Sequence, residues 1–429
     1  SRFLRTEKRI PKEILGIMSP GWKSLFLYLK EKGIMQDDLP QFESLHPDEP
    51  KLYSLRSFAS EQFLKTDGHR GALGYSRGVS DTFEHALAKT AGELLERYPL
   101  SSYNSRDLLR SSSNELKKKN AKHLDLRLLP NFLPEQKRMF PELVRSDTSV
   151  YGWTHALNLV TNTQTLIPAQ LVFWNYCRHD FDSMEPEIRP INSNGAAGHV
   201  TWEKAALAGI YKLIHRDSFL LLWLAKKVPG RIRTNELKSR RLQQLIALVE
   251  RYSLEIHFLD TTSDLNVPSC VCALIDRSEN SPRPAIALGG GCSNSMEEAM
   301  ESSITEALGV SQWTRAQPTA SLETLTLPPF TQTKLSQGER IMLWSRKEML
   351  EHFEWFLAGP EILPRCPYTD PSLSDAERLN ELVAAMKERG EEYYPYIYTA
   401  HHPVLKKVGY FSIKAIIPPS HRILASSLI

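Results

Sequence analysis

The chain has 429 residues, of which 41% are hydrophobic and 24% are charged, as is ordinary for a soluble globular protein. This length exceeds one ordinary core and predicts two or three domain-sized units. A net charge of only +3 argues against a nucleic-acid-binding protein, which needs a clustered basic excess. The run of lysines at 117–119 is typical of a solvated loop or helix end.

The sequence also argues against a membrane-spanning protein and against a protein stabilised by disulfide bonds. The longest apolar run, residues 219–225, is far too short to cross a bilayer, and the first residues contain no hydrophobic signal core. Of five cysteines, only Cys270 and Cys272 are close together, and their spacing puts both on one face of a strand. A metal site would need more ligands nearby. We therefore predict reduced, structural cysteines in a cytoplasmic protein.

Helices and strands interleave along the chain. A front segment, residues 1–50, ends in a linker around LHPDEPK. Helices are predicted at 12–18, 22–33, 84–98, 201–227, 236–252, 296–313, 339–357 and 376–390. Strands are predicted at 151–160, 165–174, 255–260, 270–276, 285–291, 393–400 and 408–417. Because there is no strict strand–helix–strand rhythm, the pattern predicts a mixed α/β (α+β) architecture with antiparallel pieces.

Three windows of the sequence align without gaps, at 82–98, 201–217 and 295–311. Each begins with Thr or Ser four residues before an alanine, which suits a helix N-cap. Each also follows a glycine-rich approach: GALGYSRGVSD, NSNGAAGHV and ALGGGCSN. A glycine-rich turn that leads into a helix N-terminus presents free N–H groups to an anion. One such turn is usually only a tight connection, but three in register predict a duplicated architecture around a shared centre.

The first window contains two acids, Glu93 and Glu96, on one face of its helix. Burying both is costly unless Arg97 or a divalent cation neutralises them. Magnesium held by one or two carboxylates plus substrate phosphates is usual in nucleotide enzymes. The third window has Glu306 at the place of Glu93, whereas the second has bases at the matching places. Taken alone, GELLERY is more simply an exposed helix with a charge cluster.

The order and spacing of these windows and their approaches resemble the YcaO family, from about Lys51 to the C-terminus. The resemblance implies a YcaO-like fold, with repeated strand–turn–helix units around a nucleotide site. It divides the chain into an N-terminal helical segment or linker at 1–50 and a YcaO domain at 51–429. It also implies ATP- and Mg²⁺-dependent chemistry in which a peptide amide oxygen is phosphorylated. A neighbouring Cys, Ser or Thr then adds to the carbonyl carbon, and phosphate leaves to give an azoline. Relatives make thioamides or amidines.

The resemblance also implies roles for individual residues. Glu93, Glu96 and Arg97 match the ExxER motif, whose acids bind magnesium associated with ATP, and Glu306 matches the acid of the third motif. The remaining matches that are implied to contact nucleotide are Arg77, Ser80, Arg216 and, with the weakest alignment, Arg315. Lys89 stands where many members have serine, and Asp217 completes the second motif.

The second window departs from the family pattern. Lys204, Lys212 and His215 stand where many members have acids, which removes up to three metal ligands. Either Lys212 and His215 grip phosphate in place of a metal, or the chain has lost catalysis and serves as a peptide- or partner-binding scaffold. Gly309 also replaces an expected glutamine, and the ending PPSHRILASSLI has no proline-rich finish.

The resemblance implies partners as well. A ribosomally made precursor peptide is the expected substrate. About fifty unmatched front residues are too few for the family's peptide-binding domain, which resembles ubiquitin-activating enzymes, so we expect that domain on a separate chain. A flavin-dependent dehydrogenase acting downstream and a homodimer are further expectations. No nucleic-acid or membrane partner is expected.

Overall fold

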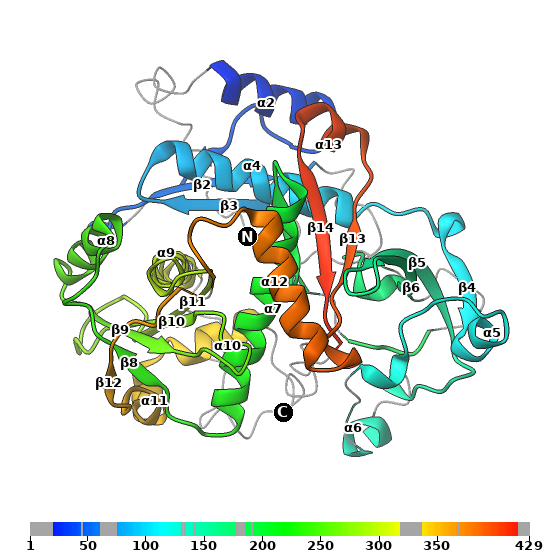
Figure 1. Cartoon of the computed structure of the whole chain (residues 1–429). Helices are drawn as coiled ribbons and strands as arrows, with labels where there is room; N and C mark the ends of the chain where they lie inside the picture. The colour runs from blue at the N-terminus through cyan, green and yellow to red at the C-terminus, as the bar shows by residue number, and fades with distance from the viewer. Residues whose placement is uncertain are drawn as a thin grey trace.

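The computed structural model describes residues 20–43, 46–60, 75–129, 132, 134–139, 143–174, 176, 178, 185–189, 192–317, 337–367 and 369–418. The predicted helix at 12–18, Cys177 and the chain end after residue 418 lie outside these ranges. Within them the architecture is mixed α/β, as predicted (Figure 1). None of the described helices is long and apolar enough to cross a membrane.

The described strands form three sheets. The first sheet has the order β1 (Gln41–Phe42), β2 (Tyr53–Phe58), β3 (Tyr75–Ser80). The second has the order β11 (Ile286–Cys292), β10 (Ser269–Ile275), β9 (Glu255–Asp260), β8 (Gly230–Ile232), β12 (Glu361–Ile362). The third has the order β4 (Leu109–Ser112), β5 (Val150–Asn158), β13 (Tyr396–Thr399), β14 (Phe411–Ile416), β7 (Ala196–His199), with β6 (Thr163–Pro168) paired to β5. All these pairs are antiparallel except β8 with β12.

Three strand–helix units occupy the centre of the molecule (Figure 1). β3, β7 and β11 each lie at the edge of a different sheet. They lead respectively into α4 (Phe83–Leu100), α7 (Trp202–Leu224) and α9 (Met296–Arg315). Each helix packs on its own strand and on the edge strand of another unit: α4 contacts β7, α7 contacts β11 and α9 contacts β3. The three sheets are therefore joined in a closed circle, although an origin by duplication stays a prediction.

The predicted N-caps lie where the windows placed them. The Thr82 hydroxyl accepts from the His85 N–H, and the Ser295 hydroxyl accepts from the Glu298 N–H, both at 3.3 Å. Thr201 also occupies the N-cap position, but its side chain caps no N–H.

The described glycines of the first and third approaches lie within strands, and the prediction of glycine-rich turns is wrong for them. A Cβ at Gly78 would lie 2.0 Å from the Ala86 carbonyl oxygen, and one at Gly289 would lie 2.1 Å from the Ala307 nitrogen. These glycines let a helix backbone pack directly on the strand. Gly195, with φ of +78°, is the glycine that does form a turn before its strand.

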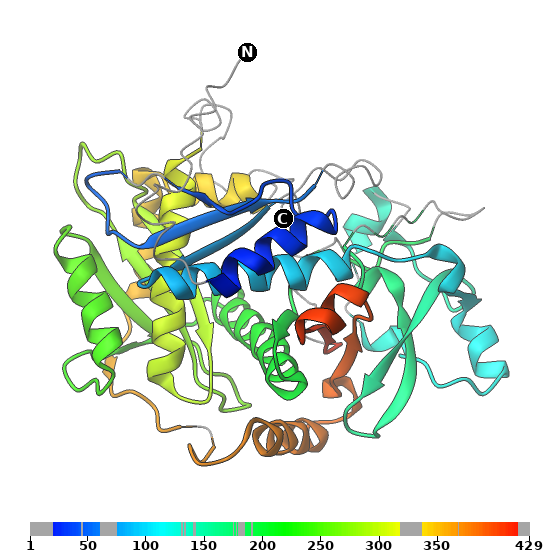
Figure 2. The ribbon, with the colours of Figure 1, turned by 90° about the horizontal axis from the view of Figure 1, so that it is seen from above.

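The front segment packs with the rest of the chain. Phe26 and Leu29 of α2 (Pro20–Glu31) are fully buried in the same core as Leu87 of α4. Figures 1 and 2 both show α2 beside α4, and β1 extends the sheet of β2 and β3. The described part of residues 1–50 is therefore built into the first core and the first sheet.

Several predicted elements have different bounds. The helix predicted at 339–357 is two helices, α10 (Gln337–Trp344) and α11 (Leu350–Leu357), separated by the 3-10 turn η7 (Lys347–Met349). The Ala285 N–H donates to the Ser345 carbonyl at 2.7 Å, which ties this break to the start of β11. The strand predicted at 165–174 ends at Pro168. A six-residue helix missed by the sequence, α13 (Pro403–Val408), precedes β14.

Asp276 links stability to pH. Its side chain is inaccessible, and its Oδ2 lies 2.6 Å from Arg283 Nε. Burial opposes ionisation, but the Ser281 hydroxyl and Arg283 outweigh it and hold the pKa of Asp276 below its ordinary value. A carboxyl with a depressed pKa in the folded state stabilises the fold above about pH 4, and this stabilisation is lost as pH falls through the folded pKa.

We therefore expect Asp276→Asn to lower the free energy of unfolding by about 3 kcal/mol at neutral pH, because it leaves Arg283 without its charged partner. The deficit should shrink below about pH 4, where the parent Asp276 also loses its charge. Urea unfolding of parent and variant at both pH values measures this. An equal deficit at neutral and acidic pH would contradict it.

Candidate functional site

The site begins with Glu93 on α4. Its Oε2 accepts the backbone N–H of Arg77 at 2.6 Å, and its Oε1 pairs with Arg97, one turn along the helix. Burial raises the pKa of Glu93, while Arg97 and the Arg77 N–H oppose that rise. The acid predicted to hold magnesium is thus fixed against the edge of β3.

The other two units make the equivalent contact. Lys212 donates from Nζ to the Ala196 carbonyl at 2.6 Å, and Glu306 Oε2 accepts the Gly290 N–H at 2.8 Å. In each unit the residue eleven positions after the N-cap contacts the residue five positions before it. A carboxylate suits the N–H groups of β3 and β11, and an ammonium suits the carbonyl of β7. The second window therefore has lysine where the others have glutamate.

Further contacts join the three units into a ring. Lys212 Nζ lies 3.3 Å from Glu96 Oε2, which connects α7 to α4. His215 packs on Gly290, where an added Cβ would lie 1.7 Å from its Nε2, and this connects α7 to β11. The Arg77 guanidinium donates to the Gly309 carbonyl at 2.7 Å and so connects β3 to α9. These contacts link the three units in a ring, in which Lys212 contacts Glu96 directly and Glu306 is linked through the Gly290 backbone and the packing of His215 on Gly290.

His215 carries no charge in this network. Burial and then the positive charge of Arg216 lower the pKa of His215 to about 3, so the imidazole is neutral at pH 7. Its Nδ1 lies 3.2 Å from the Ser269 hydroxyl. His215 is therefore equipped to hydrogen-bond a phosphate but not to neutralise one, and its predicted nucleotide contact stays a prediction.

Lys414 lies close to the ring. It is 1% exposed on β14, and its Nζ donates to the Asn192 carbonyl at 2.8 Å. Burial, with repulsion from Arg189 and Lys212, lowers the pKa of Lys414 well below its usual value, while Glu96 acts in the opposite direction. The sequence placed Lys414 on a strand, but strand alternation does not show that a lysine faces the interior beside an acid.

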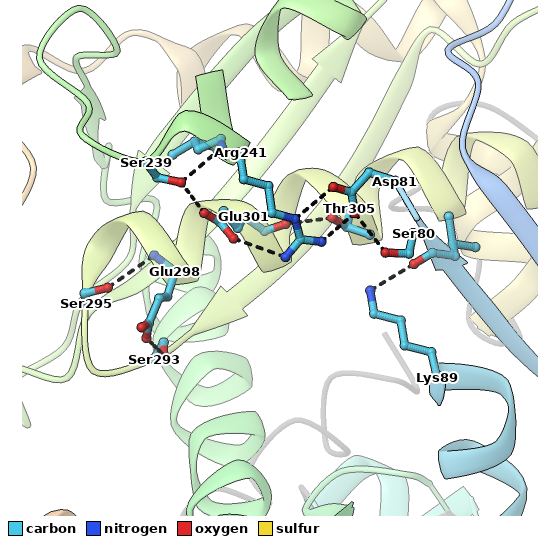
Figure 3. Close-up of polar contacts among 12 residues, drawn as sticks. Ser80, Asp81, Lys89, Ser239, Arg241, Ser293, Ser295, Glu298, Glu301 and Thr305 are labelled. Carbon is cyan, nitrogen blue, oxygen red and sulfur yellow. Dashed lines mark hydrogen bonds and ion pairs between the residues drawn. The ribbon is translucent and has the colours of Figure 1, made fainter. Parts of the chain in front are cut away.

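A second polar network, centred on Arg241, joins the residues just before α4 to α9 (Figure 3). Arg241, on α8 (Arg240–Glu250), contacts both oxygens of Asp81, at 2.7 and 3.0 Å, and lies 3.3 Å from Glu301 of α9. Lys89 donates to the Val79 carbonyl at 2.9 Å. Burial and then Arg241 lower the pKa of Lys89, whereas Asp81 and Glu306 raise it. Sequence reasoning missed Arg241 because α8 contains no repeated motif.

Three of the residues predicted to contact nucleotide form hydrogen bonds or ion pairs with other groups of the protein. Arg315 pairs with Asp48 at 2.6 Å and lies about 14 Å along α9 from Glu306, given the rise of a helix. Ser80 is fully buried and its hydroxyl donates to Asp81 at 2.9 Å. The Arg77 guanidinium is occupied by Glu43, Gly309 and Gln312. Their roles toward nucleotide stay predictions, as does that of Arg216.

The carboxylates of the described residues do not form a metal site made of protein ligands alone. In the part of the chain that the structure describes, no group of three or more His, Cys, Asp or Glu is placed to hold a metal. Cys270 and Cys272 are buried on β10, as expected for structural cysteines. Magnesium also binds through one or two carboxylates with substrate phosphates supplying other ligands, and Glu93 with Glu96 fits that arrangement.

The comparison with solved structures supports the fold. A heterocyclase in complex with substrate and cofactor aligns with a TM-score of 0.70 at 17% identity, covering 92% of this chain and 52% of its own. YcaO from Methanopyrus kandleri, bound with AMPPCP and Mg²⁺, aligns at 0.61 with 14% identity, covering 95% and 93%. The E. coli microcin synthetase McbBCD complex aligns at 0.56 with 13% identity, covering 88% and 87%. The chain thus spans about half the length of the first of these proteins.

No curated protein matches the chain at a significant level. A family model described as YcaO cyclodehydratase, ATP- and Mg²⁺-binding, matches residues 77–420. This range contains the three strand–helix units, except for the first two residues of β3, and the whole ring of contacts that joins them. Because the match extends over most of the chain, the protein is a member of the YcaO family.

Proposed function

We propose that this protein uses ATP and Mg²⁺ to activate backbone amides of a ribosomally made peptide, and that it converts Cys, Ser or Thr residues to azolines. The observation that supports this most directly is the ring that joins Glu93, Lys212 and Glu306. It places a cation of the second window beside an acid of the first and links both to the unit that carries Glu306, and a metal-bound triphosphate needs acids and cations around it.

The residues at the ring suit these roles differently. Glu93 and Glu96, one helical turn apart, are proposed to hold Mg²⁺, which would offset the charge of the phosphates. Glu306 is proposed to contribute from α9. Lys212 has a half-exposed side chain at 49% and can meet a phosphate oxygen while it remains beside Glu96. The nucleotide contacts of Arg77, Ser80, Arg97, His215, Arg216 and Arg315 belong to this proposal.

The atoms of the proposed reaction balance between substrates and products. The amide oxygen takes the terminal phosphoryl group of ATP, and ADP is released. The thiol or hydroxyl of the neighbouring residue adds to the former carbonyl carbon and loses its proton. The amide nitrogen also loses its proton. The original amide oxygen then leaves within inorganic phosphate. An amide oxygen is a poor leaving group, and phosphorylation removes that barrier, so the peptide loses the elements of one water for each ring.

A second candidate is a catalytically silent subunit that binds peptide or partner. The position of Lys212 favours this alternative, since its ammonium already neutralises Glu96 where a metal would act. A third keeps the activation step but changes the nucleophile, which gives thioamide or amidine products. For all three candidate functions, a separate peptide-binding protein is the proposed partner. If the protein forms azolines, a flavin-dependent dehydrogenase is proposed to act after it.

Incubation of the protein with ATP, Mg²⁺, its precursor peptide and any peptide-binding partner tests the proposal. Mass spectrometry should show the loss of one water per modified residue, with one ADP released for each. ADP release with a different mass change points to another nucleophile. If neither occurs, titration with ATP and Mn²⁺ decides whether the site binds nucleotide at all.

Lys212 should weaken metal binding at Glu96. We expect Lys212→Met to lower the apparent dissociation constant for Mn²⁺ about thirtyfold, because a unit charge about 4 Å from a divalent cation contributes about 2 kcal/mol in water. Paramagnetic resonance of Mn²⁺ added to the protein without ATP measures this, so that the proposed contact of Lys212 with phosphate does not contribute. Lys212→Arg, which keeps the charge, is the matched control and should resemble the parent. Unchanged or weaker Mn²⁺ binding in Lys212→Met would show that this ammonium does not compete with the metal.

A further inference from the structure

His215 of α7 is the first member of a chain of side-chain hydrogen bonds that runs into the second sheet. Its Nδ1 lies 3.2 Å from the Ser269 hydroxyl oxygen, which lies 2.9 Å from the Thr261 hydroxyl oxygen. Ser269 begins β10, and Thr261 directly follows β9. Both residues are buried, with exposed fractions of 0% and 1%. Their hydroxyl groups are therefore shielded from bulk water.

The Thr261 hydroxyl sets the direction of this chain of hydrogen bonds. A hydroxyl donates one proton, and among the residues that the structure describes Ser269 is the only hydrogen-bond partner of the Thr261 side chain. Because a buried donor without an acceptor is costly, Thr261 donates to the Ser269 oxygen. The proton of Ser269 then goes to its other neighbour, His215. The Nδ1 atom of His215 is therefore an acceptor.

The proton of His215 consequently lies on Nε2. The lowered pKa of His215 leaves the imidazole neutral, so only one of its nitrogens carries a proton. Nε2 packs on Gly290, whose N–H binds Glu306, and the described residues offer it no acceptor. His215 and Gly290 are partly exposed, and Glu306 is exposed. The Nε2 proton is therefore left for a ligand beside Glu306.

We propose that Thr261 and Ser269 fix His215 as a hydrogen-bond donor to a phosphate oxygen of ATP, and not as a metal ligand. A histidine that binds a metal through Nε2 needs a lone pair there and donates its Nδ1 proton to an acceptor. The hydroxyl chain runs in the opposite direction. The inference rests on the proposed function, adds the atom that contacts the nucleotide, and makes Thr261 and Ser269 positioning residues.

The neighbouring lysine agrees with this assignment. Lys212 lies one turn before His215 on α7 and is also a donor, whereas the equivalent residues of the first and third units are the carboxylates Glu93 and Glu306. Carboxylates reach phosphate through a metal, while N–H groups bind phosphate oxygens directly. The second unit is thus the one that offers donors to the nucleotide.

Nitrogen-15 magnetic resonance of the full chain, labelled at its histidines, tests the tautomer. The signals of His215 are those that disappear in His215→Gln. At neutral pH the parent should show an unprotonated Nδ1 and a protonated Nε2, and the reverse would overturn the inference while the proposed function stands. Thr261→Val removes the hydroxyl donor, so both tautomers should be populated, and Thr261→Ser should restore the parent spectrum. A spectrum unchanged in Thr261→Val would also overturn the inference.

Binding experiments with ATP test the contact itself. Asparagine at position 215 places its amide N–H groups only near Nδ1, whereas glutamine reaches the place of Nε2. His215→Asn should therefore raise the dissociation constant for ATP about fivefold more than His215→Gln, the usual effect of one hydrogen bond. Equal effects would overturn the inference.

Electron spin-echo spectroscopy of Mn²⁺ with ATP gives an independent result, because it detects nitrogen ligands of the metal. A nitrogen coupling in the parent that is lost in His215→Gln would make His215 a metal ligand and overturn the inference. The expected ATP binding pattern without ADP release in the presence of precursor peptide would refute the proposed function and keep the inference. A parent that binds no ATP would overturn both.

Discussion

In a Glu93→Gln variant, ADP release in the presence of precursor peptide should fall at least about a hundredfold, the usual effect of losing one preorganised electrostatic group. The amide oxygen of glutamine still accepts the Arg77 N–H, so the edge of β3 stays in place. The charge proposed to hold Mg²⁺ is lost. Binding of ATP with Mn²⁺ should weaken in parallel, because the phosphates and Glu93 share the metal.

Glu381→Gln is a suitable control for this variant. Glu381 is exposed on α12 (Asp375–Glu388), outside the ring, and its neutralisation should change neither ADP release nor Mn²⁺ binding. Thermal unfolding of both variants checks that the fold is retained. If Glu93→Gln binds nucleotide and metal as the parent does, the carboxylate is only a clamp on β3, and the magnesium assignment fails.

The second large effect is a loss of stability, which we expect when Gly289 is replaced by alanine. A Cβ there would lie 2.1 Å from the Ala307 nitrogen and 2.2 Å from the Ser303 carbonyl oxygen, both backbone atoms of α9. A backbone cannot move aside as a flexible side chain does, so α9 must shift from β11. We expect Gly289→Ala to lower the free energy of unfolding by about 3 kcal/mol, the upper part of the usual range for overpacking.

Gly309 on the same helix provides the matched control. A Cβ at Gly309 would meet nothing closer than 3.7 Å, and alanine is the better helix former by about 1 kcal/mol. Gly309→Ala should therefore be neutral or stabilising in the same urea titration, where Gly289→Ala loses stability. Equal stability of Gly289→Ala and the parent would show that α9 and β11 do not pack as closely as described.

The sequence predicted the local features of the site better than its contacts. The N-caps at Thr82 and Ser295 and the matching places of Glu93 and Glu306 follow from windows that can be aligned by eye. The contact of Lys212 could not be predicted, because the pattern does not show that β7 turns a carbonyl toward α7. Periodicity indicates which face of an element is buried but not which atom it meets.

Residues outside the windows were missed for a related reason. Arg241 and Lys414 lie in segments without a repeat, and only tertiary packing brings Arg241 to the second polar network and Lys414 close to the ring. The break between α10 and α11 was missed because no glycine or proline interrupts the apolar pattern there. The pairing of Arg315 with Asp48 was also missed, and the nucleotide role that the resemblance implies for Arg315 stays a prediction.

The circular packing of the three units has a consequence for the order of synthesis. The bond from Arg77 to the Gly309 carbonyl spans 232 positions, and the bond from the Ser412 hydroxyl to the Glu96 carbonyl spans 316. Contacts so distant in sequence cannot form until the later partner has left the ribosome. The packing around Glu96 therefore cannot be completed before Ser412 of β14 has been translated.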